Sequence, residues 1–357
     1  MTHPYRSLPA AQSWRDAVAA MEPFRVDPVV APRFRIGPGD PVATAGSCFA
    51  QHLSRHLART GFLPLVTEEG AHLDPATRRA QQYGMFPARF GNIYTVRQLL
   101  QLFEECFDGR RPAEVAWARE DGRWVDALRP RVLPEGHADE ASVLADRVPH
   151  LDAVRRMFTG CAVFVFTLGL TEAWRSRIDG TVFPLAPGVA GGEFDPARHE
   201  FVNFDAAEVS ADLERFLGRL RAVNPRVNVL LTVSPVPLAA TCEPRHVLVA
   251  STYSKAVLRV AADGAWRRHD WVDYFPSFEI VTGSHTGGGY FGIDGRQVEP
   301  LAVEHVMRVF AAYQSGASSP SASPTAGPPG PTWSATKTRS TRPVGPRLSP
   351  PRGGGVR

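Results

Sequence analysis

The stretch that decides the fold is Pro41-Val-Ala-Thr-Ala-Gly-Ser-Cys-Phe-Ala50. Its first six residues are small and mostly apolar, which is typical of a short buried strand. After Ser47, apolar residues recur at helical spacing from Ala50 to Ala58, and Gly61 stands where a helix would end. A strand, a tight turn that carries a hydroxyl, and a helix form the first unit of an α/β domain.

The same alternation continues along the chain. The unbroken apolar run 161–168 is typical of a strand buried on both faces, and strands are also predicted at 227–233 and 271–275. We therefore predict an α/β, three-layer, flavodoxin-like fold, with a mostly parallel sheet and helices on both faces. The predicted helices cover residues 92–107, 151–158, 207–220, 253–262 and 301–313.

The domain is expected to span residues 25–313, after an N-terminal wrapping segment at 1–24. Residues 108–145 and 175–205 are predicted to be irregular, the first as an insertion. Residues 314–357 consist mainly of Ser, Pro, Gly, Thr and Arg, so we expect a disordered basic tail. The net charge of the whole chain is +4 and that of the tail is +6, so the net charge of the remaining residues is −2. Binding of nucleic acid through the tail is therefore the lowest-ranked prediction.

Composition also bounds the cofactors and the cell compartment. The four Cys have no CxxC spacing, and there is no phosphate-binding glycine loop, so no metal or other cofactor is implied. No signal-peptide stretch begins the chain and no long apolar run follows, which predicts a cytoplasmic protein without a membrane span.

Ser47 is the first candidate for chemistry. A serine between a strand and a helix lies beside N–H groups that can hold a developing oxyanion, although the same position suits a simple helix cap. Cys48 is an alternative nucleophile, because a thiolate at a helix N-terminus is activated.

Several motifs resemble the GSCFA family. They are Gly46-Ser-Cys-Phe-Ala50, Tyr94-Thr-Val-Arg-Gln-Leu99, Phe166-Thr-Leu-Gly-Leu-Thr-Glu-Ala-Trp174, Thr232-Val-Ser-Pro-Val236 and Asp273-Tyr-Phe-Pro-Ser-Phe-Glu279. The family is similar to the SGNH/GDSL hydrolases, which act on esters, and the resemblance implies a bacterial protein. The resemblance implies a serine esterase or acyltransferase that works through an acyl-Ser47 intermediate, with an O-acylated carbohydrate as the expected substrate.

The resemblance also implies an oxyanion site and a base. The oxyanion donors would come from Gly91, Asn92, Gly169 and Thr171, although Thr171 and Glu172 replace the Asn and Asp of the related hydrolases. The expected Asp-x-x-His motif is absent, since Asp294-Gly-Arg-Gln297 ends in glutamine, so His246 or His285 is the predicted base.

Two further residues and one further function complete the predictions. Tyr253 and Lys255 are predicted to support the site, and Lys255 is the sole lysine before the tail. Because the motif of the base is missing, the alternative function is a catalytically degenerate binding protein on the same fold.

Overall fold

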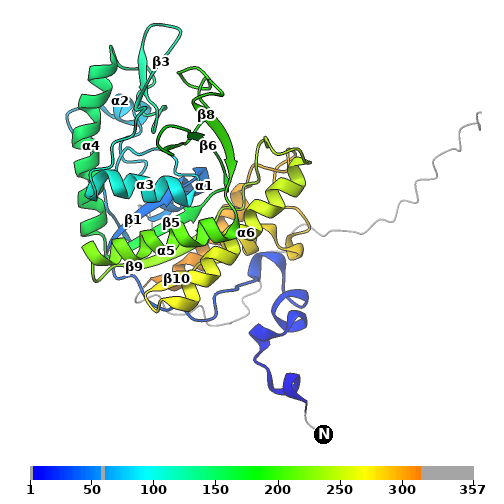
Figure 1. Cartoon of the computed structure of the whole chain (residues 1–357). Coiled ribbons are helices and arrows are strands. Elements are labelled where there is room, and N and C mark those ends of the chain that lie inside the picture. The colour runs from blue at the N-terminus through cyan, green and yellow to red at the C-terminus, as the bar shows by residue number, and fades with distance from the viewer. Residues whose placement is uncertain (1–2, 58–60, 315–357) are drawn as a thin grey trace, which may run out of the picture. The chain divides into compact units, whose positions relative to one another are not determined.

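The computed structural model describes residues 3–57 and 61–314, and the predicted disordered tail lies outside them. Five parallel strands form the central sheet in the order β10-β9-β5-β1-β2 (Figure 1). They are β1 (Pro41–Gly46), β2 (Leu63–Pro64), β5 (Val163–Leu168), β9 (Asn228–Val233) and β10 (Val272–Tyr274). The predicted fold class is thus confirmed. The strand order reverses between β1 and β5, and ligands of such sheets bind beyond the strand ends at that point.

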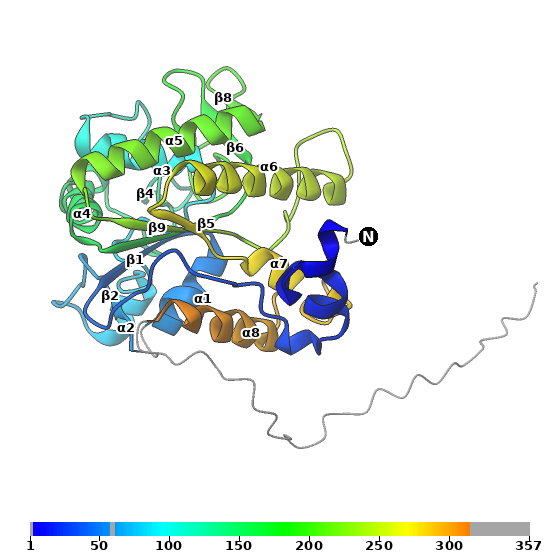
Figure 2. The same cartoon turned by 90° about the horizontal axis from the view of Figure 1, so that it is seen from below.

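Helices cover both faces of this sheet (Figure 2). Phe164 and Phe166 of β5 belong to the core on one face, whereas Val163 and Val165 belong to the core on the other. Side chains alternate along a strand, so an unbroken apolar run supplies both cores. One face carries α3 (Val96–Phe107), α4 (Glu140–Gly160), α5 (Ala206–Val223) and α6 (Val247–Arg268); the other carries α1 (Cys48–Leu57), α7 (Ser277–Thr282) and α8 (Pro300–Phe310).

Helix α4 is much longer than the predicted helix 151–158. Asp139 caps it by accepting a hydrogen bond from the Ser142 N–H at 2.8 Å. Its buried face includes Arg147 and His150, while Leu144 and Val148 are exposed. The apolar periodicity over the first half of α4 is therefore weak, which explains the error.

Two regions predicted to be irregular contain antiparallel strands. The first holds β3 (Ala116–Ala118) and β4 (Trp124–Asp126), and the second holds most of a sheet ordered β7-β6-β8. The latter strands are β6 (Glu172–Ser176), β7 (Val182–Phe183) and β8 (His199–Asn203). These strands are short, and much of β6 and β8 is only half-buried. Neither an alternation of apolar and polar residues nor an apolar run therefore predicted them. Because β6 follows directly after β5, this second sheet lies beyond the strand ends of the first.

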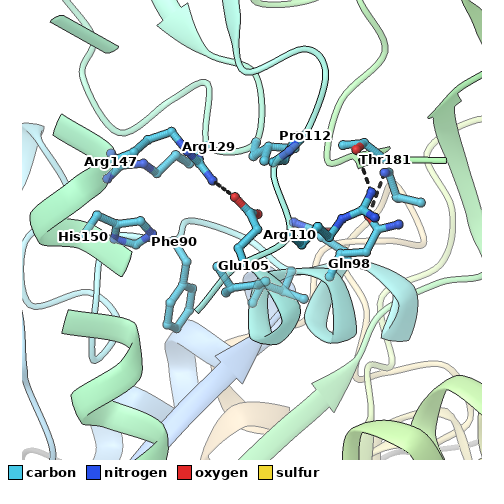
Figure 3. Close-up of a pocket in the computed structure, with 14 residues that line it drawn as sticks. Phe90, Gln98, Glu105, Arg110, Pro112, Arg129, Arg147, His150 and Thr181 are labelled. Carbon is cyan, nitrogen blue, oxygen red and sulfur yellow. Dashed lines mark hydrogen bonds and ion pairs between the residues drawn. The ribbon is translucent and has the colours of Figure 1, made fainter. Parts of the chain in front are cut away.

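A buried ion network fixes β4 to α3 and α4. Asp126 is 1% exposed and accepts from Arg129 at 2.7 Å and from Arg147 at 2.8 Å. Arg129 also binds Asp146 at 2.6 Å, and Arg147 binds Glu105 of α3. Arg129, Arg147, Glu105 and His150 line a small cavity of about 30 Å³ (Figure 3). Its ion pairs with Asp126 and Asp146 fix the position of Arg129, which also lines a cavity described below.

His150 gives the fold a pH dependence. Burial, with help from Arg129, lowers the pKa of His150 to about 4, and its Nδ1 lies 2.8 Å from Glu68 Oε2. The unfolded chain, with an ordinary His pKa near 6.5, then binds more protons than the folded chain between about pH 4 and 6.5. His150 should therefore lower the free energy of unfolding by about 2 kcal/mol from pH 7 to pH 5, measured by urea denaturation, and His305, whose pKa burial also lowers to about 4, should add a similar fall. His150→Gln should remove about half of the fall, and an equally steep profile in that variant would contradict the assignment.

No helix among the described residues is both long enough and apolar enough to cross a lipid bilayer.

Candidate active site

Ser47 lies between the end of β1 and the start of α1. Gly46, with φ of 142°, lets β1 come close to β5, because a Cβ there would lie 2.5 Å from Thr167 O. Ser47 is 5% exposed, and its Oγ has no hydrogen-bond partner. The hydroxyl therefore does not cap α1. A buried hydroxyl without a partner costs about 1–3 kcal/mol, so one that persists calls for a functional reason.

A cavity of about 400 Å³ opens onto Ser47 at the point where the strand order reverses; we call it the Ser47 cavity. Residues that follow β1, β5 and β9 line its floor: Ser47, Gly169 and Ser234. The second sheet contributes aromatic side chains to the wall, and the remaining surface is largely aliphatic. The larger apolar side chains are Leu170, Trp174, Phe183, Leu185, Phe201, Val236 and Leu238.

Gly169 packs directly behind Ser47. A Cβ at Gly169 would lie 3.3 Å from the Cβ of Ser47 and 2.8 Å from Tyr94 O, so only glycine fits. The N–H groups of Gly169 and Leu170 donate to Tyr94 O at 3.2 and 3.0 Å, and buried Lys255 donates to Gly169 O at 2.6 Å. The N–H of Gly169, the predicted oxyanion donor, is therefore already hydrogen-bonded within the protein. Lys255 fixes the loop that packs behind Ser47.

The other predicted oxyanion residues lie outside the Ser47 cavity. Thr171 is fully buried, and its hydroxyl donates to Asn203 Oδ1 at 2.6 Å. Asn92 donates to Tyr94 Oη at 3.1 Å and, with Gly91, lines a neighbouring cavity. Of the four predicted donors, the structure brings Gly169 alone into the cavity that holds Ser47.

Glu172 is the one carboxylate that lines the Ser47 cavity among the described residues. Thr241 Oγ1 donates to its Oε1 at 2.7 Å, which fixes the side chain in place. Burial raises the pKa of Glu172 above its ordinary value, so its carboxylate accepts a proton more readily than an exposed one.

A sequence model of the GSCFA family matches residues 41–310, more than half of the chain. The chain belongs to the GSCFA family. No curated protein matches the sequence. One solved crystal structure matches at 15% identity and a TM-score of 0.26, over 45% of this chain and 68% of its own, which is too weak to carry an argument.

In this GSCFA protein, neither predicted histidine lines the Ser47 cavity. His246 is exposed and caps α6: its Nδ1 accepts from the Leu248 N–H at 3.1 Å, which leaves the proton on Nε2. His285 lies in the turn Ser284–Thr286, its buried Nε2 has no partner, and burial lowers its pKa. Ser47 Oγ is therefore not hydrogen-bonded to either one.

Arg296 lines the cavity from the loop Asp294-Gly-Arg-Gln297, and its Nε donates to Pro237 O at 3.3 Å. Tyr253 lies on α6 outside the cavity lining, and the side chain of Cys48 is outside the described part of the structure. No cluster of three or more metal-ligating side chains occurs within residues 3–57 and 61–314.

Sequence reasoning missed Tyr94, Trp174 and Phe201 as cavity residues. The two aromatic side chains of the second sheet were missed because its strands were not predicted. Tyr94 stands in a motif that the family resemblance had already marked, so its position in the chain was the available signal.

Proposed function

We propose that this GSCFA protein is a serine esterase or acyltransferase that works through an acyl-Ser47 intermediate. The observation that carries the proposal is the buried, unpartnered Oγ of Ser47 at the floor of the cavity. The hydroxyl lies where the strand order reverses, the usual ligand position in this fold. A bound ester would supply the contact that the hydroxyl lacks in the protein.

The reaction needs a group that takes the serine proton, and we propose Glu172. As Oγ attacks the ester carbonyl, its proton passes to the Glu172 carboxylate, directly or through one water molecule. Collapse of the tetrahedral intermediate breaks the bond to the leaving alcohol, which takes the proton from Glu172. Water or a second alcohol then attacks acyl-Ser47 and returns the enzyme to its starting state.

The apolar wall of the Ser47 cavity supports an acyl group as the part of the substrate that binds there. Trp174, Phe183 and Phe201 offer aromatic surface, and surface of that kind favours hydrocarbon over hydroxyl groups. The O-acylated carbohydrate class rests on the family resemblance.

Labelling with a fluorophosphonate probe tests the proposal, because such probes react with activated serines. The wild type should be labelled, and Glu172→Gln should lower the labelling rate by at least about 10²-fold, the contribution of a general base. His246→Ala and His285→Ala should label at rates close to that of the wild type.

Loss of labelling in His285→Ala alone would transfer the role of base to that histidine. A folded wild type that is never labelled would contradict the serine mechanism. The second candidate, a binding protein on the same fold, is favoured by the absence of histidine from the cavity lining. It would bind esters without turning them over.

A further inference from the structure

A second cavity adjoins the Ser47 cavity. Its volume is about 210 Å³, and it shares Tyr94, Pro184 and Leu185 with the Ser47 cavity as lining residues. Gln51 also lines the second cavity, and this residue lies one helical turn after Ser47 in the sequence. The two cavities thus meet beside the candidate nucleophile.

The lining of the second cavity differs in chemistry from that of the first. Three amide side chains and two arginines line it: Gln51, Gln82, Asn92, Arg129 and Arg131. We call it the polar pocket. Amides both donate and accept hydrogen bonds, as sugar hydroxyls do, and guanidinium groups donate in a fixed fork.

Gln82 has an unusual backbone. It is the one non-glycine residue with positive φ, at 62°, in the described ranges 3–57 and 61–314. It follows α2 (Pro75–Ala80) and its C-cap Gln81, where glycine would adopt this conformation without cost. Its Nε2 donates to Arg131 O at 2.8 Å. The Gln82 side chain thus ties its own loop to the backbone of Arg131 at the pocket.

The arginines provide the second observation. The side chain of Arg129 is 1% exposed, yet its Nη1 has no hydrogen-bond partner, while its other nitrogens bind Asp126 and Asp146. Arg131 is exposed and forms no ion pair within the described part of the chain. Arg129 thus adds positive charge beside the pocket, and the exposed guanidinium of Arg131 can donate to oxygen atoms of a ligand.

We propose that the polar pocket binds the hydroxyl-bearing carbohydrate part of the substrate, while the Ser47 cavity holds its acyl group. The inference rests on the proposed function and deepens it. The ester bond would then lie beside Tyr94, where the two cavities meet and within reach of Ser47. Specificity for the sugar would come from Gln82, Asn92 and the two arginines.

The test compares two esters of the same acid, 6-O-acetylglucose and p-nitrophenyl acetate, on the full chain. Gln82→Gly removes the side chain and suits the local backbone, so the variant should fold. Its kcat/KM should fall at least about tenfold more for the sugar ester than for the nitrophenyl ester, through KM, since hydroxyl contacts are lost. Arg131→Ala should shift the same ratio in the same direction.

Gln81→Ala is the matched control, because Gln81 is the neighbouring residue and does not line the pocket. It should leave the ratio unchanged. An unchanged ratio in both Gln82→Gly and Arg131→Ala would overturn the polar-pocket proposal while the serine mechanism stands. If the wild type cleaves neither ester, the proposed function fails; saturation-transfer NMR with 6-O-acetylglucose then decides the pocket. Sugar signals that Gln82→Gly abolishes would support it, and no signal on the wild type would overturn it.

Discussion

Replacing Ser47 with alanine is expected to lower kcat for p-nitrophenyl acetate by at least about 10³-fold, as loss of a nucleophile does. The same change should leave the free energy of unfolding unchanged or raise it slightly. Ser47 Oγ is buried without a partner, so its removal costs the protein no hydrogen bond and deletes a desolvated polar group. Turnover and urea denaturation of the full chain measure the two effects.

Ser54→Ala is a suitable control, because Ser54 lies on α1 outside both cavity linings. It should change neither quantity. Retained turnover in Ser47→Ala would point to another nucleophile, such as Cys48. A large loss of stability instead would mean that the Ser47 hydroxyl serves the fold.

Asp126→Ala should lower the free energy of unfolding by about 3–5 kcal/mol, the cost of leaving buried charges unpaired. Burial alone would raise the pKa of Asp126, but Arg147 and Arg129 more than offset this and hold it well below its ordinary value. Removing the carboxylate leaves Arg129 with Asp146 and Arg147 with Glu105, so each of the two buried guanidinium groups loses one of its counter-charges. Chemical denaturation of the full chain gives the measurement.

Asp121→Ala is the matched control, since Asp121 lies in the turn between β3 and β4 and pairs with half-exposed Arg119. That change should cost less than about 1 kcal/mol. Adding Arg129→Met, Arg147→Met and Glu105→Gln to Asp126→Ala should recover part of the loss, because no buried charge of the network is then left without a counter-charge. Equal losses in the two single variants would contradict the importance of the network.

Four of the five central strands could be predicted because their signals are local, whereas the two-residue strand β2 was missed. The apolar run of β5 is buried on both faces, and the turn at Ser47 joins a strand to a helix within ten residues of sequence, 41–50. The second sheet could not be predicted, because its strands are only two to five residues long, are partly exposed and contain no long apolar run. A local pattern does not distinguish such strands from loop segments.

Only part of the candidate site could be predicted from the sequence. Ser47, Gly169, Glu172 and Lys255 are all found at or directly behind one cavity. The hydrogen-bond partner of Thr171 could not be predicted, because its hydroxyl donates to Asn203 of β8, and that strand was not predicted. His246 was expected beyond a strand end, but the N-terminus of α6 uses its ring nitrogen as a cap.

The most direct test of the central claim is mass spectrometry of the full chain, quenched with acid during turnover of p-nitrophenyl acetate. An acyl-serine ester survives acid, so the account predicts a mass increase of one acetyl group. Proteolysis should place that group on Ser47, and Ser47→Ala should not acquire it. An acetyl group found on any other residue, or turnover without a trapped acyl group in either protein, would contradict the acyl-Ser47 mechanism.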